Sequence, residues 1–217
     1  MITIDGPAGA GKSTLGQLLA DRLGYLYFDT GSMYRALAWA ALHYHTDLAD
    51  IGATTELARR LNIAILPPTV VDGRQYTVIV DGNDVTWNLR DGDVERTVSQ
   101  AASSPPVREV MRSRQREIGE RGRVVMVGRD IGSIVMPDAP IKIYLDATVD
   151  ERAKRRAAEL RARGVDAEEQ QIRDEIVRRD ALDRHVSSPA DDAVIIVSDG
   201  LSPEQVADAV LSRVQKR

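Results

Sequence analysis

The stretch Gly6-Pro7-Ala8-Gly9-Ala10-Gly11-Lys12-Ser13 decides the fold of this chain, because it directly follows the short apolar run Ile2–Ile4. It matches the pattern G-x-x-x-x-G-K-[ST] at every fixed position. The next residues, Ser13–Leu23, are expected to form a helix that ends at Gly24. A strand, a glycine-rich turn and a helix in this order predict a phosphate-binding loop, and this context disfavours a turn that holds no ligand.

The chemistry of this loop indicates ATP with Mg²⁺. Glycines let the backbone turn tightly and direct successive N–H groups at one anion, and the following helix adds the positive end of its dipole. Lys12 supplies a cation for the β- and γ-phosphates, and the Ser13 hydroxyl is the expected Mg²⁺ ligand. The predicted ATP-binding residues are Gly6, Pro7, Ala8, Gly9, Ala10, Gly11, Lys12, Ser13 and Thr14.

Alternation of apolar runs and helical segments predicts an α/β fold with a doubly wound parallel sheet. The five expected core strands are Ile2–Ile4, Tyr25–Phe28, Val124–Val127, Ile141–Leu145 and Ala193–Val197. Further helices are expected at 33–43, 56–61, 94–102, 107–118, 168–182 and after Ser202-Pro203. Thr148-Val149-Asp150-Glu151 is typical of a capping box and starts an arginine-rich helix that ends near Gly164.

Residues 62–90 show short strand-like segments and turn signals instead of alternating strands and helices, and they predict a small antiparallel insertion. The strand-like segments at 64–66, 76–80 and 84–86 are separated by the turn signals Asp72-Gly73 and Asp81-Gly82. The insertion therefore interrupts the alternation of parallel strands and helices.

Two arginines follow expected core strands, where ligands of open parallel sheets gather. Arg35 ends Asp29-Thr30-Gly31-Ser32-Met33-Tyr34-Arg35, and Arg129 lies in Gly128-Arg129-Asp130-Ile131-Gly132. Either guanidinium can form a planar, bidentate clamp on a second phosphate, which a kinase needs for its acceptor. The alternatives are a surface arginine at 35 and a structural Arg129–Asp130 pair at a tight turn.

These motifs together resemble the bacterial cytidylate kinase family, and the resemblance runs essentially from end to end. Further matching pieces are Val107-Arg108-Glu109, Pro-Asp-Ala-Pro-Ile-Lys-Ile-Tyr-Leu at 137–145, and Arg-Arg-Asp-Ala-Leu-Asp at 178–183. The insertion at 62–90 is similar to the enlarged nucleotide-binding subdomain of these kinases. The resemblance implies transfer of the γ-phosphoryl group of ATP to CMP or dCMP.

The resemblance also implies a layout of one P-loop kinase domain over residues 1–217. Its core would comprise 1–29, 119–147 and 168–217. A subdomain for the nucleoside monophosphate would cover 30–118, with the strand insertion at about 62–90. A helical lid would cover about 148–167.

Roles for single acceptor-site residues follow from the same resemblance. Ser99, Arg108 and Asp130 would read the cytosine edge, whose amine and N3 and O2 acceptors suit a carboxylate, an arginine and a hydroxyl. Uracil lacks the amine and should be a poorer substrate. The residues implied for the CMP phosphate are Arg35, Arg129 and Thr30, and those for the sugar are Arg179 and Asp183.

Spacing alone leaves simpler interpretations of several of these residues. Ser99 can be an ordinary helix residue, and Arg108 can pair with Glu109 on a solvated face. Arg179 and Asp183 have the i, i+4 spacing of a helix ion pair, which is worth only ~0.3 kcal/mol. The family pattern favours the functional interpretation.

Arginines at 152, 155, 156 and 163 lie near one stripe of the expected lid helix. A mobile lid would close over ATP, bring arginines to the transferring group and exclude water. Arg155 and Arg156 are the candidates, and with Lys12 and Arg129 they complete the predicted catalytic set. The alternative is a solvated helix with Glu151–Arg155 and Glu159–Arg163 ion pairs.

The segment after Asp183 departs from the commonest family pattern, Asp-Ser-x-Arg-x-x-Ser-Pro. This chain has Asp183-Arg184-His185-Val186-Ser187-Ser188-Pro189, which is one residue shorter. Val186 falls where the pattern has arginine, so we expect Arg184 to supply that charge, toward the substrate phosphates, from a shifted position.

Composition opposes several other classes of function. The balance of 29 Lys+Arg against 33 Asp+Glu gives a net charge of -4, which opposes nucleic-acid binding through a broad basic surface. Without cysteine there are no disulfides, and the three histidines lack metal-site spacing. Neither a signal peptide nor an apolar stretch of ~18 residues is recognisable, so we expect a cytoplasmic protein, and without heptads a monomer.

Two rival functions remain at this level. A different small P-loop kinase, such as an adenylate or shikimate kinase, lacks the cytosine-reading set and the insertion. A regulatory module that only senses ATP has no need for arginines beyond the loop. The acceptor-side arginines therefore favour the kinase.

Overall fold

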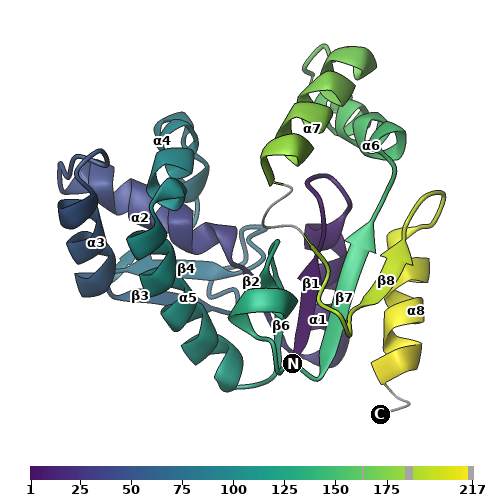
Figure 1. Cartoon of the computed structure of the whole chain (residues 1–217), viewed down its shortest axis with the longest axis horizontal. Helices are drawn as coiled ribbons and strands as arrows, with labels where there is room; N and C mark the ends of the chain where they lie inside the picture. The colour runs from purple at the N-terminus through teal and green to yellow at the C-terminus, as the bar shows by residue number, and fades with distance from the viewer. Residues whose placement is uncertain (163, 184–187, 215–217) are drawn as a thin grey trace. The chain divides into compact units, whose positions relative to one another are not determined.

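The computed structural model describes residues 1–162, 164–183 and 188–214, with the side chains in these ranges except those of 179, 182, 183 and 214. The chain divides into two compact units (Figure 1). The first contains Met1–Tyr25 and Val125–Arg217, and the second contains Leu26–Val124. The phosphate-binding loop belongs to the first unit and the antiparallel insertion to the second.

A parallel sheet of five strands has the order β2-β6-β1-β7-β8. β1 pairs with β6 on one side, with Ile2 opposite Val125, and with β7 on the other, with Ile2 opposite Ile141. The order of strands reverses at β1, so the carboxyl ends of β1 and β6 flank the switch point at which such sheets bind ligands. The predicted α/β fold is confirmed, and its strands are β1 (Ile2–Asp5), β2 (Leu26–Asp29), β6 (Val124–Val127), β7 (Ile141–Asp146) and β8 (Val194–Val197).

Burial along the strands follows this order. All residues of β1 and of β6 are buried, as their apolar runs predict for central parallel strands. β8 lies at the edge of the sheet, and there Ile195 and Val197 are exposed. The strands next to the switch point are therefore the most firmly packed.

The helices of the first unit begin and end at recognisable signals. α1 stops at Gly24, which is left-handed with φ 64°, and α8 starts with a reciprocal capping box between Ser202 and Gln205. Thr148 accepts from Glu151 N as predicted, but its own N–H donates to Asp199 instead of Glu151. These helices are α1 (Lys12–Leu23), α6 (Val149–Ala162), α7 (Glu169–Asp183) and α8 (Pro203–Val214), with a π-helical turn at Ile131–Val135.

α6 and α7 pack side by side as a helical pair (Figure 1). Their shared apolar cluster is built from small alanines and from Ile172, which lets the helices approach closely. Its other members are Ala153, Ala157 and Ala167, with Leu160 and Ile176 at the margin. α7 therefore packs on the arginine-rich helix that the sequence predicts as the lid.

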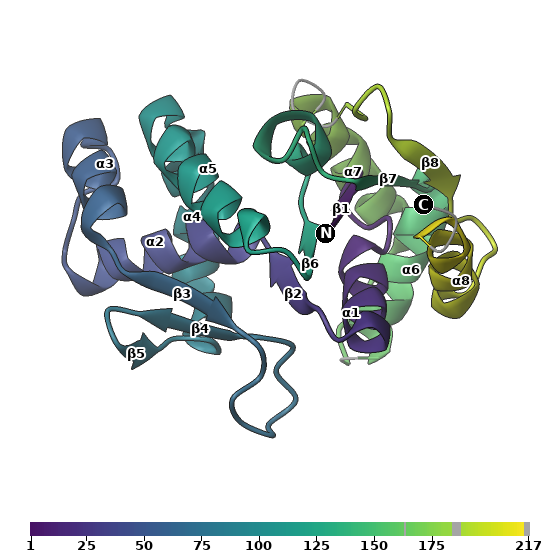
Figure 2. The same ribbon diagram turned by 90° about the horizontal axis from the view of Figure 1, so that it is seen from below.

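The second unit combines helices with a small antiparallel sheet of order β3-β4-β5 (Figure 2). Ile63 lies opposite Val80, and the β4–β5 turn uses Asp81 and Gly82, both with positive φ, as its Asp-Gly signal predicts. The elements are α2 (Gly31–His43), α3 (Ile51–Arg60), β3 (Ile63–Leu66), β4 (Thr77–Val80), β5 (Asn83–Asp84), α4 (Gly92–Ser103) and α5 (Pro105–Glu120), with a 3₁₀ turn at Asn88–Arg90.

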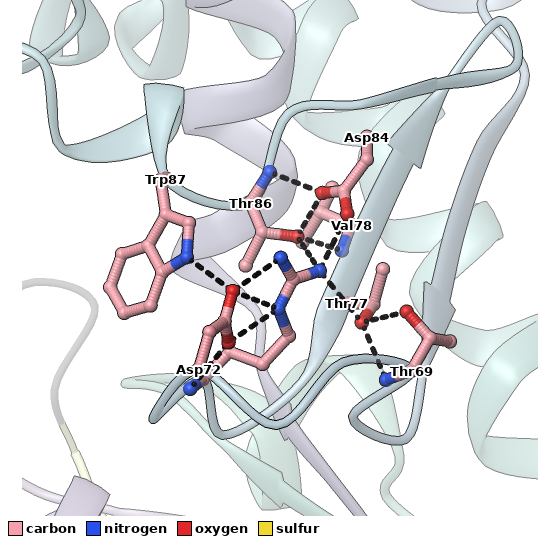
Figure 3. A network of polar contacts seen from close by, with 8 residues as sticks. Thr69, Asp72, Thr77, Val78, Asp84, Thr86 and Trp87 are labelled. Atoms are coloured by element: carbon pink, nitrogen blue, oxygen red, sulfur yellow. Dashed lines mark hydrogen bonds and ion pairs between the residues drawn. The ribbon is translucent and has the colours of Figure 1, made fainter.

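The guanidinium of Arg74 joins the loop before β4 to β5 through Asp72 and Asp84. Both carboxylates are labelled in Figure 3. Its side chain is only 6% exposed and donates to Asp72 at 2.7 Å and to Asp84 at 2.5 Å. Hydrogen bonds from Arg74 and from the Trp87 indole hold the pKa of Asp72 well below its usual range. The loop is thus tied to the sheet by charge-assisted hydrogen bonds.

Two helix starts differ from those that the sequence suggested. α3 begins at Ile51 rather than at 56, because Asp50 caps it by accepting from Ala53 N at 2.9 Å. α5 begins at Pro105 rather than at 107, because proline fits the first turn of a helix, where no N–H is needed. None of the helices in the described part of the chain has the length and apolar character needed to cross a bilayer.

Candidate active site

The loop between β1 and α1 depends on glycine at three positions. Gly6, Gly9 and Gly11 have φ values of 144°, 81° and 93°, which other residues rarely adopt. A Cβ on Gly6 would lie 2.0 Å from the carbonyl oxygen of Leu145 in β7. The loop can therefore wind tightly across the end of the sheet only with glycine in these places.

Lys12 and Ser13 occupy the first turn of α1, where backbone N–H groups are unpaired within the helix. The Lys12 ammonium folds back over the loop and donates to the Pro7 carbonyl at 2.7 Å. Ser13 and Thr14 are exposed. A hydroxyl in this position fits Mg²⁺, which takes one or two protein ligands and leaves room for phosphate oxygens.

A pocket of about 130 Å³ opens beside the loop, within the first unit. Its walls are mainly apolar, and Arg155 and Ser198 supply polar groups at its edge. Such a pocket suits a flat, largely apolar ring with a few polar atoms. Its other lining residues are Ala10, Gly11, Thr14, Leu15, Leu145, Leu201, Pro203 and Val206.

Arg152 connects α6, the helix predicted to form the lid, to the loop. Its side chain is 4% exposed, and its guanidinium donates to the Ala8 carbonyl at 3.0 Å and to both Asp180 oxygens, at 3.0 and 2.5 Å. Its Nε also donates to the Ala147 carbonyl. One buried cation thus joins the loop, α6 and α7.

The two lid candidates, Arg155 and Arg156, lie in different surroundings. Arg155 donates to the side chain and carbonyl of Ser198, at 3.0 and 2.7 Å, and pairs with Glu151 as the spacing predicted. Arg156 pairs with Glu159 on the exposed side of α6. Arg155 is therefore at the pocket, and Arg156 is on the solvated face.

The turn after β6 carries Arg129 and Asp130. Gly128 N donates to the Ile4 carbonyl at 3.0 Å, so the turn starts where β1 ends. Ile134 N and Val135 N both donate to the Asp130 carbonyl, which makes the π-helical turn. Single π-helical turns of this kind are frequent at functional sites.

The second unit holds Thr30 and Arg35 at the start of α2. Arg35 lies 3.5 Å from Asp29, whose carboxylate also accepts from Gly31 N at 2.9 Å. A Cβ on Gly31 would lie 3.1 Å from Asp29 Oδ1 and 3.2 Å from Arg35 Nη1, which explains the glycine. Burial, with the charge of Asp29, raises the pKa of Tyr76 to about 12, so its phenol stays protonated here.

Arg108 and Ser99 are the base-reading candidates of the same unit. Arg108, on α5, places its guanidinium over the ring of Tyr34 at 5.9 Å, an arrangement that orients its donors. Ser99 lies exposed on α4. The remaining acceptor candidates with described side chains, Arg129 and Asp130, belong to the first unit.

Two predicted residues lie outside the described ranges: Arg163 of the arginine stripe and Arg184 after the departure from the family pattern. Arg179 and Asp183 belong to α7, but their side chains are likewise not described.

The sequence patterns do not identify several residues that the structure places at this site. Asp180 occurs only within the motif at 178–183, and no pattern singles out Ser198 or Leu201. The one available signal was the segment Ser198-Asp199-Gly200 directly after the last core strand, because ligands gather at strand ends.

Comparisons with known proteins agree with this geometry. The model of the cytidylate kinase family matches residues 2–216. A cytidylate kinase of Roseiflexus castenholzii is 67% identical, covering 100% of this chain and 94% of that protein, and one of Bacillus subtilis is 46% identical, covering 100% and 96%. An uncharacterized protein from Eubacterium ventriosum is 13% identical with a TM-score of 0.51, covering 100% and 98%, and shares the fold alone. The chain therefore belongs to the cytidylate kinase family.

Proposed function

We propose that this chain transfers the γ-phosphoryl group of ATP to CMP or dCMP, giving ADP and CDP or dCDP. The observation that supports this proposal is that a glycine loop with Lys12 and a turn with Arg129 follow neighbouring strands of one sheet. The glycine loop follows β1, and the turn with Arg129 and Asp130 follows β6. A donor phosphate and an acceptor phosphate need such a pair of sites.

On the donor side, the loop residues 6–14 bind the phosphates of ATP, with Lys12 as the cation for the β- and γ-groups. The Ser13 hydroxyl would hold Mg²⁺, which would supply positive charge to offset the negative charge of the phosphates. The apolar pocket beside Arg155 and Ser198 receives the adenine ring. The assignment of the adenine ring to this pocket is supported by the lining of the pocket, which includes Gly11 and Thr14 of the phosphate-binding loop.

On the acceptor side, Arg35 and Arg129 clamp the phosphate of CMP, with Thr30 near it. Ser99, Arg108 and Asp130 read the cytosine edge, and Arg179 and Asp183 contact the sugar. Arg184 contributes positive charge toward the substrate phosphates. Planar guanidinium groups suit this task because each can donate two parallel hydrogen bonds to one phosphate.

Lid closure brings Arg155 and Arg156 to the transferring group and excludes water, so that CMP competes with hydrolysis. The proposed layout is a core of 1–29, 119–147 and 168–217, a nucleotide-binding subdomain of 30–118 and a lid of about 148–167. Because α7 packs on α6, we propose one change to this layout: α7 (Glu169–Asp183) moves with the lid and not with the core. We propose further that the enzyme is a cytoplasmic monomer.

A coupled assay of ADP release tests the function directly. With ATP and Mg²⁺ as donor, we expect turnover with CMP and dCMP and a much lower kcat/KM with UMP. The loss arises because groups that bind the cytosine amine are left unpaired by uracil. AMP and shikimate serve as controls for other small kinases, and faster turnover of UMP, AMP or shikimate than of CMP would refute the proposal.

Replacement of Arg129 tests the acceptor clamp. We expect Arg129→Ala to lower kcat/KM for CMP by about 10²-fold, because a charge-stabilising donor is lost from the transition state. Arg129→Lys should recover only part of the loss, since an ammonium cannot form the bidentate contact. Circular dichroism of both variants checks the fold, and unfolding of Arg129→Ala would identify a structural ion pair instead.

A further inference from the structure

Asp5, the last residue of β1, makes a contact that none of the proposed substrate roles requires. It is only 4% exposed and directly precedes Gly6 of the phosphate-binding loop. Its Oδ1 accepts from Ile131 N at 2.8 Å and its Oδ2 from Gly132 N at 2.7 Å. Both oxygens are thus used by backbone groups of the turn that carries Arg129 and Asp130.

These two amides stand at the start of the π-helical turn, where no earlier helical residue can accept from them. Asp5 therefore acts as a cap supplied from a distant strand, 126 residues away in the sequence for Ile131. A single carboxylate that accepts two N–H groups fixes both the height and the orientation of the turn above the sheet.

Close packing shows that the turn cannot settle elsewhere without cost. A Cβ on Gly132 would lie 3.0 Å from Thr3 Oγ1, 3.2 Å from Asp5 Oδ2 and 3.3 Å from Lys142 Cδ. The turn thus lies directly on side chains of β1 and β7, and a side chain at 132 would push these neighbours, Asp5 among them, by a few tenths of an ångström.

We infer that Asp5 is a positioning residue of phosphoryl transfer: its ionised carboxylate holds the 129–132 turn in register with the adjoining loop Gly6–Ser13. This inference rests on the proposed function, because it assumes that Arg129 and Asp130 bind the acceptor. The donor loop and the acceptor turn then share one rigid element, the end of β1. Transfer needs such precision, since a displacement of about 1 Å can cost 10²-fold in rate.

Protonation of Asp5 would disturb this arrangement. A neutral carboxyl presents an O–H donor, so one of the two amides loses its acceptor. Burial raises the pKa of Asp5 to about 6 from 3.8, opposed by the hydrogen bonds from Gly132 and Ile131. The charged groups that face it are Asp130, which raises its pKa, and Lys12, which lowers it, while Lys142 from β7 is bound to Asp192.

The sign of the pH effect differs between stability and activity. Because the folded protein binds this proton more tightly than the unfolded chain, the contribution of Asp5 to stability falls as pH rises from about 4 to about 6. The ordered turn, in contrast, requires the ionised form of Asp5, so the turn becomes ordered over the same rise in pH. Activity is therefore expected to increase where this contribution to stability decreases.

The test follows the amide resonances of Ile131 and Gly132 by NMR between pH 5 and 8, in the wild-type protein without nucleotide. Both amide proton shifts should move with a common midpoint near pH 6, since they donate to one titrating carboxylate. Asp5→Asn should abolish the midpoint, because an amide side chain does not titrate. Exchange of these two amides with solvent at pH 8 as fast as in an unfolded chain would show that the ionised carboxylate does not hold them, and would overturn the inference even if the variant did not fold.

Kinetics of Asp5→Asn supply the functional readout. We expect kcat/KM for CMP to fall about 10²-fold and the affinity for ATP to change little. The second ionisation of a phosphate also has a pKa of about 6, so Asp5→Asn should keep a shallower acid limb that belongs to CMP alone. An unchanged kcat/KM with an acid limb of unchanged slope would refute the inference. Asp50→Asn is the matched control, because that carboxylate also accepts a backbone N–H, at the start of α3.

The outcomes separate this inference from the proposed function. If Arg129→Ala keeps full activity with CMP, the acceptor assignment fails, whatever Asp5 does. If Arg129→Ala loses activity but Asp5→Asn does not, the acceptor assignment stands and the positioning role of Asp5 is wrong.

Discussion

The Lys12→Met variant is expected to lose at least about 10²–10³-fold in kcat with CMP, which is the usual effect of removing one charge-stabilising donor at a reacting group. The ammonium already lies over the loop, within 2.7 Å of the Pro7 carbonyl, so it is in place before substrate arrives. Methionine has a stem of similar length but no charge. The measurement is steady-state ADP release at saturating ATP and CMP.

Two observations make the Lys12→Met result interpretable. The lost hydrogen bond from Lys12 to the Pro7 carbonyl is worth about 1 kcal/mol, so the melting temperature should change little. Lys154→Met is the control, because Lys154 is an exposed lysine of α6 with the same change of side chain. Near-normal turnover of Lys12→Met would mean that the loop does not bind the transferring phosphates.

The Arg152→Met variant should show the largest loss of stability among the arginine variants of the lid. It removes the donor to Ala8 and leaves the Asp180 carboxylate, itself partly buried, without its cation. Breaking a buried pair from one side costs about 3 kcal/mol or more. For a chain of this size the melting temperature should fall by roughly 6–12 °C.

Variants of the same helical pair distinguish a buried charge from helix packing in general. Arg173→Met removes an exposed ion pair between α7 and α6, Arg173 with Asp150, and should leave the melting temperature nearly unchanged. Combining Arg152→Met with Asp180→Leu should recover part of the loss, because no uncompensated carboxylate remains. Equal melting temperatures for wild type and Arg152→Met would contradict the anchoring role.

Arg152 also shows what helical spacing in a sequence does not predict, namely the surroundings of a side chain. The helical spacing predicts that Arg152, Arg155 and Arg156 lie near one stripe of the helix. In the structure Arg152 is buried, Arg155 borders a pocket and Arg156 faces solvent. Helical periodicity gives the angle of a side chain around its own helix, but not the neighbour that covers that side. The neighbours that bury Arg152 are α7, through Asp180, and the carbonyl of Ala8.

The sequence by itself determined the order of strands and helices, the phosphate-binding loop, the antiparallel insertion and the family. Those features depend on local patterns: apolar runs, turn residues and glycines whose backbone no other residue readily adopts. Only the tertiary structure decided that Asp5 holds the turn of Ile131 and Gly132 and that Arg152 binds Asp180. Such contacts join residues far apart in the chain, and they form because a buried charge must find partners wherever the packed sheet and helices present them.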